Sequence, residues 1–331
     1  MKYQELMHAL DRGEVRPLLY LHGDEPYLMD KLVRRLLDLL VPRDMRDFNM
    51  EVFYGNENSG AEIVEAAATL PMFADWRVVL VKKADALPAV SLEAIAGYLD
   101  NPSPVTCLVF LGEKIDQRKK FFAEFKKKGE LVECRRLYEN QLGSFITAEA
   151  AARGKKIEGA AAEMLVYLVG NNLRELVSEV EKASLYAGDR NTVTVQDIRE
   201  VASDTRVNSV FELADALGEK KIDRALRSLD TLLEGGEAPL LVLAMITRHF
   251  RQLWKVRELL DRKAPARDIG KAAGINPYFL QGIIPQARNY QPVELRRLFE
   301  KIFQTDLALK TGRIKPRVVL ERLLLDACGK P

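Results

Sequence analysis

Short apolar runs alternate with helical patterns through residues 1–140, and this alternation limits the fold more than any other feature of the sequence. The predicted strands are Leu18–Leu21, Asn49–Phe53, Val78–Val81, Thr106–Leu111 and Glu130–Cys134. The helical patterns cover Asp24–Leu40, Ala61–Ala68, Leu92–Leu99 and Arg118–Lys127. Short buried strands separated by helices predict an α/β domain, in which a parallel sheet carries helices on both faces.

The strand signal disappears after residue 140, and the rest of the chain has helical patterns only. A first group, in residues 141–207, comprises Gln141–Arg153, Gly159–Val169, Leu173–Tyr186 and Val195–Val201. Residues 204–208 are interpreted as a break. The second group, in residues 208–331, comprises Ser209–Leu217, Ile222–Leu233, Pro239–Leu260, Ala266–Ala273, Pro277–Arg288, Pro292–Leu309 and Pro316–Ala327. Capping-box patterns at Thr194-x-x-Asp197 and Ser209-x-x-Glu212 support two of the helix starts. We therefore expect a small helical domain followed by a C-terminal helical bundle.

Composition excludes several classes of protein. The chain has 331 residues, 47% of them hydrophobic and 30% charged, which is typical of a globular protein of two or three domains. No apolar run approaches the roughly 20 residues that span a bilayer, and no signal-peptide core follows the N-terminus. The three cysteines and three histidines lack metal-ligand spacing. We expect reduced thiols, a cytoplasmic location, no metal and no cofactor.

The end of the first predicted strand is where a phosphate-binding loop would lie. Such a loop needs the pattern G-x-x-x-x-G-K-[ST], whose backbone N–H groups, lysine and hydroxyl hold phosphates and Mg²⁺. Counting from Gly23, the last three places of the pattern are Leu28, Met29 and Asp30. Asp24 and Glu25 would in addition repel a phosphate. The sequence therefore has a loop at the expected place, but it lacks the second glycine, the lysine and the hydroxyl that bind phosphate.

The end of the third predicted strand also lacks the residues that ATP hydrolysis needs. In a P-loop ATPase an acidic pair follows this strand and serves Mg²⁺ and the attacking water. Here Lys82 and Lys83 follow Val78–Val81, and two cations can do neither. We expect a nucleotide site that does not function, without catalytic residues. Salt bridges from the two lysines to Asp24, Glu25 or Asp85 could stabilise the empty site.

Basic residues gather locally although the net charge is only +2. The segment Arg118–Lys128, with Lys119 and Lys120, would face a phosphate backbone or an acidic partner, or would simply be the solvated face of a helix whose phenylalanines pack inward. Arg248, Arg251 and Lys255 share a helix face beside Trp254 and His249. These residues would bind single-stranded nucleic acid, or would be solvated or paired within a helical assembly.

Four segments carry a resemblance to a known family. They are Tyr20–Leu28, Lys114–Lys120, Gly170–Leu176 with Glu179–Lys182, and Asp306–Gly312. Together with Lys82-Lys83, and in this order, they resemble the delta subunit of the bacterial DNA polymerase III clamp loader, over nearly the whole chain. The resemblance implies a degenerate AAA+ (P-loop-like) domain at 1–140, a helical lid domain at 141–207 and a helical collar domain for oligomerisation at 208–331.

The resemblance also implies a function. Members of this family bind the ring-shaped β sliding clamp and open it, or hold it open, without hydrolysing ATP. The implied partners are the gamma or tau ATPase subunits and delta-prime in a hetero-pentamer, with primed DNA within the assembly. Such a subunit has no enzymatic activity by itself and is a component of a polymerase holoenzyme, a nucleotidyltransferase.

The same resemblance places the clamp-binding tip between the second helix of the α/β domain and the next strand. The matching stretch is Thr69–Arg77, where Met72-Phe73 stands in place of the family's Leu-Phe. Methionine is a flexible substitute that suits an apolar pocket. Met72 and Phe73 are therefore the expected anchors, with Leu70 beside them and Trp76 packed in the core.

Other interpretations stay open at this point. Phe73 and Trp76 could both pack under the sheet, because residues just before a strand often do. A divergent ATPase is one alternative function, and a delta-prime-like scaffold subunit is another. The delta-prime family usually has zinc-ligand cysteines and a Ser-Arg-Cys finger, and this sequence contains neither.

Overall fold

The structure is a computed structural model that describes residues 1–116, 118–201, 204–312 and 314–329, without the side chains of 204–208, 266 and 267. Gln117, in one of the segments that carry the resemblance, lies outside the described residues. Contacts within the chain divide it into two compact units, Met1–Arg136 and Leu137–Pro331.

The first unit is built on a five-stranded sheet in which every neighbouring pair of strands is parallel. The strand order is β2-β3-β4-β1-β5. The strands are β1 (Leu18–His22), β2 (Met50–Tyr54), β3 (Arg77–Lys82), β4 (Thr106–Gly112) and β5 (Glu130–Glu133). Because the strands are parallel, the residues that follow them share one edge of the sheet, and those that precede them share the opposite edge.

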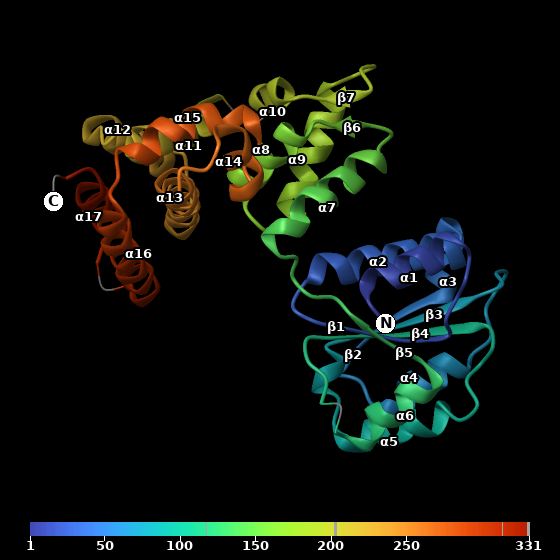
Figure 1. Ribbon diagram of the computed structural model, residues 1–331. Helices are drawn as coiled ribbons and strands as arrows, with labels where there is room; N and C mark the ends of the chain where they lie inside the picture. The colour runs from blue at the N-terminus through green and yellow to red at the C-terminus, as the bar shows by residue number, and fades with distance from the viewer. Residues whose placement is uncertain (117, 202–203, 313, 330–331) are drawn as a thin grey trace. The chain divides into compact units, whose positions relative to one another are not determined.

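Helices cover both faces of this sheet (Figure 1). One face carries α1 (Tyr3–Asp11), α2 (Pro26–Leu40) and, after the 3₁₀ turn η1 (Arg43–Met45), the short α3 (Arg46–Asn49). The other carries α4 (Gly60–Ala68), α5 (Ala89–Tyr98) and α6 (Lys120–Lys128); a second 3₁₀ turn, η2 (Ala84–Ala86), follows β3.

An aromatic cluster fills the core between the sheet and α6. Phe121, Phe122 and Phe125 of α6 are buried, as the amphipathic pattern predicts. The rings of Tyr20 and Phe110 stack with centroids 5.6 Å apart, and Phe125 meets Phe110 edge-on at 5.8 Å. Large apolar side chains from β1, β4 and α6 thereby bury the centre of the sheet and fix its helices.

The second unit is almost entirely helical. Its first helices are α7 (Glu139–Ala151), α8 (Gly159–Val169), α9 (Leu173–Tyr186) and α10 (Val195–Val201), together with the paired two-residue strands β6 (Lys156–Ile157) and β7 (Thr192–Val193). The helices that follow are α11 (Asp204–Gly218), α12 (Ile222–Glu234), α13 (Pro239–Asp261), α14 (Ala266–Ala273), α15 (Pro277–Arg288), α16 (Pro292–Thr311) and α17 (Pro316–Cys328). Proline is the first residue of α13, α15, α16 and α17, where its missing N–H leaves no helical bond unmade.

The predicted α/β and helical parts are confirmed, and the strands shift by no more than a residue at either end. The Thr194–Asp197 capping box is also confirmed, since each backbone N–H donates to the other side chain. The break at 204–208 is wrong: α11 begins at Asp204, so Ser209 lies inside a helix rather than at its cap. Residues 204–208 contain neither proline nor glycine to stop it.

Two further differences concern short elements. The pair β6–β7 contradicts the expectation that no strand follows residue 140, although two-residue strands leave too little pattern to detect. Helix α1 was not predicted; it buries Leu6, Ala9 and Leu10. The proposed domain boundary at 207/208 falls inside α11, and the three-part division of the chain stays a prediction.

Phe125→Ala should lower the free energy of unfolding of the first unit by about 3–5 kcal/mol, because it leaves a cavity among three aromatic rings. Urea unfolding followed by Trp76 fluorescence in a Trp254→Phe background would measure this. Lys126→Ala, on the exposed side of the same helix, is the control. A loss below about 1 kcal/mol would contradict the packing.

Candidate functional site

The loop between α4 and β3, residues 69–76, presents large apolar side chains to solvent; we call it the tip. Leu70 is 70% exposed, Met72 49% and Phe73 86%, while Trp76 is half-buried. Phe73 also has a backbone φ of 54°, in the left-handed region that a bulky residue seldom adopts. Because β3 follows at once, the tip lies at the edge of the sheet where the strands begin.

Two buried polar side chains hold the tip against the sheet. Asn49, at the end of α3, accepts a hydrogen bond from the Met72 N–H at 2.6 Å and donates one to the Met72 carbonyl at 2.7 Å. Arg77, the first residue of β3, donates from Nε to the Ala66 carbonyl and from Nη1 to the Phe48 carbonyl, both at 3.0 Å. The backbone of the tip is therefore fixed, although its side chains are exposed.

The opposite edge of the sheet brings together the residues of the degenerate nucleotide site. Gly23 to Glu25 follow β1, and Lys82 ends β3. A parallel strand of six residues is about 20 Å long, so this site and the tip lie at opposite ends of β3. Lys119 and Lys120 begin α6 in the segment after β4, also at this edge, and are exposed.

The loop after β1 is closed by the chain's own backbone. The Gly23 N–H donates to the Gly112 carbonyl at 3.3 Å, and the Glu25 N–H donates to the Cys134 carbonyl at 3.1 Å. A Cβ atom on Gly23, whose φ is +140°, would lie 2.1 Å from the Cys134 oxygen. N–H groups that would point at a phosphate in a working loop are therefore already bonded within the protein.

A carboxylate of the chain stands at the beginning of α2. The Glu25 side chain, largely buried, accepts a hydrogen bond from the Tyr27 N–H at 3.2 Å and caps the helix. A helix N-terminus favours a negative charge at this place, and a bound phosphate would use the same N–H groups. Glu25 thus holds a negative charge where a nucleotide would place its own.

The predicted salt bridges of Lys82 and Lys83 are wrong, because the carboxylates have other partners. Asp24 accepts a hydrogen bond from the Arg136 N–H at 2.9 Å, and Asp85 accepts one from the Glu113 N–H at 3.2 Å. The Lys82 ammonium instead lies 5.9 Å from the centroid of the Tyr54 ring. This cation–aromatic contact keeps the lysine near the edge of the sheet without a carboxylate.

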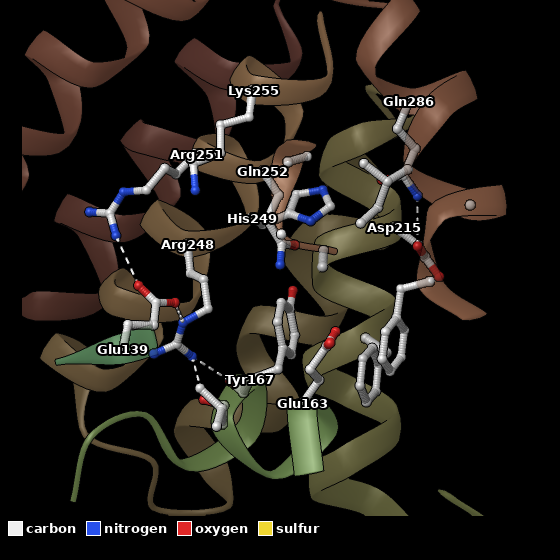
Figure 2. A pocket seen from close by; sticks show the side chains of 18 of the residues that line it. Glu139, Glu163, Tyr167, Asp215, Arg248, His249, Arg251, Gln252, Lys255 and Gln286 are labelled. Atoms are coloured by element: carbon white, nitrogen blue, oxygen red, sulfur yellow. Dashed lines mark hydrogen bonds and ion pairs between the residues drawn. The ribbon is translucent and has the colours of Figure 1, made fainter. Parts of the chain in front are cut away.

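The basic face of α13 is used within the second unit (Figure 2). Arg248 donates to the carbonyls of Val166 and Tyr167, each at 2.8 Å, and so satisfies the end of α8. Arg248 and Arg251 both pair with Glu139, at 3.2 and 3.5 Å. Of the two interpretations of these arginines, the geometry favours pairing within the helical unit.

The same arginines border a cavity of about 510 Å³ in the second unit (Figure 2). Its aromatic wall is formed by Tyr167, Phe211 and Phe279, whose rings are nearly parallel. The polar wall includes His249 and Gln286; His249 Nε2 and Gln286 Oε1 are buried and have no hydrogen-bond partner in the described part of the chain. Burial lowers the pKa of His249 to about 4, so its ring is neutral at pH 7.

The described residues offer neither a metal-binding cluster nor a membrane-spanning helix. Across residues 1–116, 118–201, 204–312 and 314–329, no cluster of three or more histidine, cysteine, aspartate or glutamate side chains is placed to hold a metal ion. No helix within these ranges is both long and apolar enough to cross a membrane. All three cysteines are free thiols.

Two family models match the chain. Residues 19–135 match the model of the DNA polymerase III delta subunit, and residues 207–327 match the model of its C-terminal domain. The chain belongs to the DNA polymerase III delta subunit family. The first match contains the tip and the degenerate site, and the second contains the helices from α12 to α16.

Individual members of the delta family extend this similarity over the whole length. The chain is 28% identical to DNA polymerase III subunit delta of Bacillus subtilis, over 97% of this chain and 96% of that protein. Its identity to the corresponding subunit of Escherichia coli is 22%, over 99% and 96%. The solved structure of the Bacillus subtilis DNA clamp loader delta protein superposes with a TM-score of 0.62 at 27% identity, covering 99% of this chain and all of that one.

Three residues that shape these two regions of the delta-family chain were not identified from the sequence. Asn49 was placed at the start of a strand and Arg77 at the end of the tip, but neither was given a role. Their partners lie between 11 and 29 residues away, a separation at which sequence carries no direct signal. Glu25 was recognised as unfavourable for phosphate, but its position as the helix cap was not.

The buried His249 should make the second unit less stable in mild acid. Its pKa is about 4 when folded and about 6.5 when unfolded, so below pH 6.5 the unfolded chain binds the extra proton. This lowers the free energy of unfolding by roughly 1 kcal/mol at pH 5.5. Partial desolvation raises the pKa values of Glu163 and Asp215, and this acts in the opposite direction.

The measurement is therefore a comparison with His249→Gln at pH 7.5 and 5.5, by urea unfolding followed by Trp254 fluorescence in a Trp76→Phe background. The wild type should lose about 1 kcal/mol more than the variant between the two pH values. His8→Gln, on the exposed side of α1, is the matched control. Equal losses in wild type and His249→Gln would contradict the burial of a neutral ring.

Proposed function

We propose that this chain is the clamp-loader subunit that binds the β sliding clamp through the tip and opens the ring, or holds it open, for loading onto primed DNA. The observation that carries the proposal is the exposure of Met72 and Phe73 on a backbone that buried side chains hold in place. Monomeric proteins seldom leave such apolar side chains together in solvent without a partner. The similarity to the Bacillus subtilis DNA clamp loader delta protein supports the same conclusion.

The tip would supply most of the binding energy through a few side chains. Burying one Met or Phe side chain is worth about 1.5–3 kcal/mol, and binding energy at interfaces concentrates in a few such anchors. Opening a ring requires in addition that the tip binds the open or distorted ring more tightly than the closed one, since a ligand shifts an equilibrium only by its difference in affinity. The chain would then act by binding alone, without a chemical step.

We infer that the chain does not hydrolyse ATP. The support is the closed loop after β1, the Glu25 cap of α2, and Lys82 and Lys83 at the end of β3. Each removes a different requirement of phosphoryl transfer: the N–H cradle, room for the phosphate charge, and the ligand of Mg²⁺. The energy of loading would then come from the gamma or tau subunits of the assembly.

The helices from α11 onward would form the collar through which the chain joins these ATPase subunits and delta-prime. Phe303 and Leu307 of α16 and Leu240 of α13 are exposed apolar residues of this part. In such an assembly the exposed Lys119 and Lys120 would be available to DNA or to a neighbouring subunit, although Lys120 also pairs with Glu124 at 3.7 Å. Arg248 and Arg251 both pair with Glu139 within the helical unit. The chain would serve a polymerase holoenzyme in the cytoplasm without being an enzyme by itself.

Met72→Ala/Phe73→Ala should weaken binding to the β clamp of the same organism by at least about a hundredfold, because about 3–6 kcal/mol of apolar burial is lost. Surface plasmon resonance without nucleotide measures this directly. Leu185→Ala/Tyr186→Ala removes an adjacent exposed pair on α9, 74% and 54% exposed, and is the matched control. Unchanged affinity in the tip variant would contradict the assignment.

ATP with Mg²⁺ should leave the melting temperature of the chain unchanged up to millimolar concentrations. A nucleotide bound at 100 times its Kd would stabilise the fold by about 2.7 kcal/mol, which shifts a melting curve visibly. Differential scanning calorimetry over a series of ATP concentrations is the measurement. A melting temperature that rises with ATP concentration would support the divergent ATPase instead.

A further inference from the structure

We propose that the tip is held in its binding conformation before the partner arrives, with Asn49 as the positioning residue, and that Phe48 is an additional apolar contact of the same surface. This inference rests on the proposed function, since it concerns the surface that would meet the β clamp. It extends the docking surface from the tip to the junction of α3 and β2, residues 48 and 49.

Asn49 is placed as a positioning residue by its hydrogen bonds. Its side chain is fully buried, and its amide oxygen and nitrogen bond the N–H and the carbonyl of Met72, at 2.6 and 2.7 Å. The amide nitrogen also donates to the Met45 carbonyl at 3.0 Å, which orients the side chain from behind. One amide thus fixes both polar groups of the Met72 backbone, as a neighbouring strand would.

Arg77 secures both ends of the tip. Its guanidinium bonds the Ala66 carbonyl, in the last turn of α4, while its own backbone begins β3. Arg77 is nearly fully buried, and its guanidinium also pairs with the Glu51 carboxylate, which compensates its charge in this position. The tip therefore spans two fixed points and is tied at its centre by Asn49.

The backbone of Phe73 indicates that these bonds determine the conformation. A φ of 54° is unfavourable for a bulky residue, and such angles persist where the surrounding structure imposes them. At Phe73 the result is a nearly fully exposed ring. An unconstrained loop would relax to a more favourable φ at this residue. We therefore attribute the angle to the hydrogen bonds that hold the preceding residue, Met72.

Phe48 belongs to the same surface by position and chemistry. Its carbonyl is held by Arg77, and the residue after it holds Met72, so its place beside the tip is fixed. Its ring is 55% exposed, and aromatic side chains are enriched among the residues that carry binding energy. The partner that fits is a protein with an apolar pocket wide enough for several side chains, which under the proposed function is the β clamp.

Asn49→Ala should slow association with the β clamp on the order of tenfold, the effect expected if about a tenth of the molecules keep a competent tip. The dissociation rate should change little, since Met72 and Phe73 still make their contacts once bound. Asn58→Ala is the matched control, because the Asn58 side chain bonds the Tyr54 N–H at the other end of β2. An association rate equal to that of the wild type, in a folded Asn49→Ala protein, would overturn the positioning role.

Hydrogen exchange in the wild type tests the same point without any substitution. The Met72 amide should exchange at least about tenfold more slowly than in an unstructured peptide, in the free chain as well as in the complex. Exchange at the unstructured rate in the free chain, with protection only on binding, would mean that the tip is ordered by its partner, and would overturn the proposal.

Phe48→Ala should weaken clamp binding on the order of tenfold, with faster dissociation. Tyr186→Ala, which removes an equally exposed aromatic ring from α9, is the matched control. An unchanged affinity for Phe48→Ala would remove this residue from the surface. If the wild type itself does not bind the clamp, the proposed function fails. If Met72→Ala/Phe73→Ala loses affinity while Phe48→Ala and Asn49→Ala bind as the wild type does, the proposed function stands and the roles of Phe48 and Asn49 are wrong.

Discussion

The backbone ladder that joins β3 to β2 and β4 is the interaction on which the remaining structure depends. It sets Val78 opposite Met50 and Cys107, so that β3, with its apolar centre, is fixed between β2 and β4. Its two ends are polar, with Arg77 at the first residue and Lys82 at the last. The ladder thus places the anchor of the tip at one edge of the sheet and the degenerate nucleotide site at the other.

Under the proposed function, this separation lets a fold with the layout of a nucleotide-binding domain bind a protein partner instead. The edge where ligands bind in open α/β sheets is the carboxyl end of the strands. Here that edge is occupied by the chain's own groups: the Cys134 carbonyl against Gly23 and the Glu25 carboxylate at the start of α2. The opposite edge, which carries no ligand in most such folds, presents the exposed tip. Binding of a partner at one edge therefore does not require a nucleotide at the other.

The sequence predicted those parts of the fold whose signal is local. Apolar runs such as Val78–Val81 identify buried strands, and prolines such as Pro239 and Pro277 mark helix starts within a residue. The position of Met72 and Phe73 between a helix and a strand suggested a surface loop but left packing under the sheet open, and the resemblance to a family favoured exposure. Asn49 could not be found, since its role depends on a partner 23 residues away that only the folded sheet brings close. The helix across 204–208 was missed because the polar residues there suggested a break. The segment has no proline or glycine to end a helix, and α11 runs through it.

The most direct test of the central claim is a cryo-electron microscopy structure of this chain bound to the β clamp of its own organism. We expect the Met72 and Phe73 side chains in an apolar pocket of the clamp, with Asn49 still bonded to the Met72 backbone and a positive φ at Phe73. A clamp seated on another surface, with the tip left in solvent, would contradict the account.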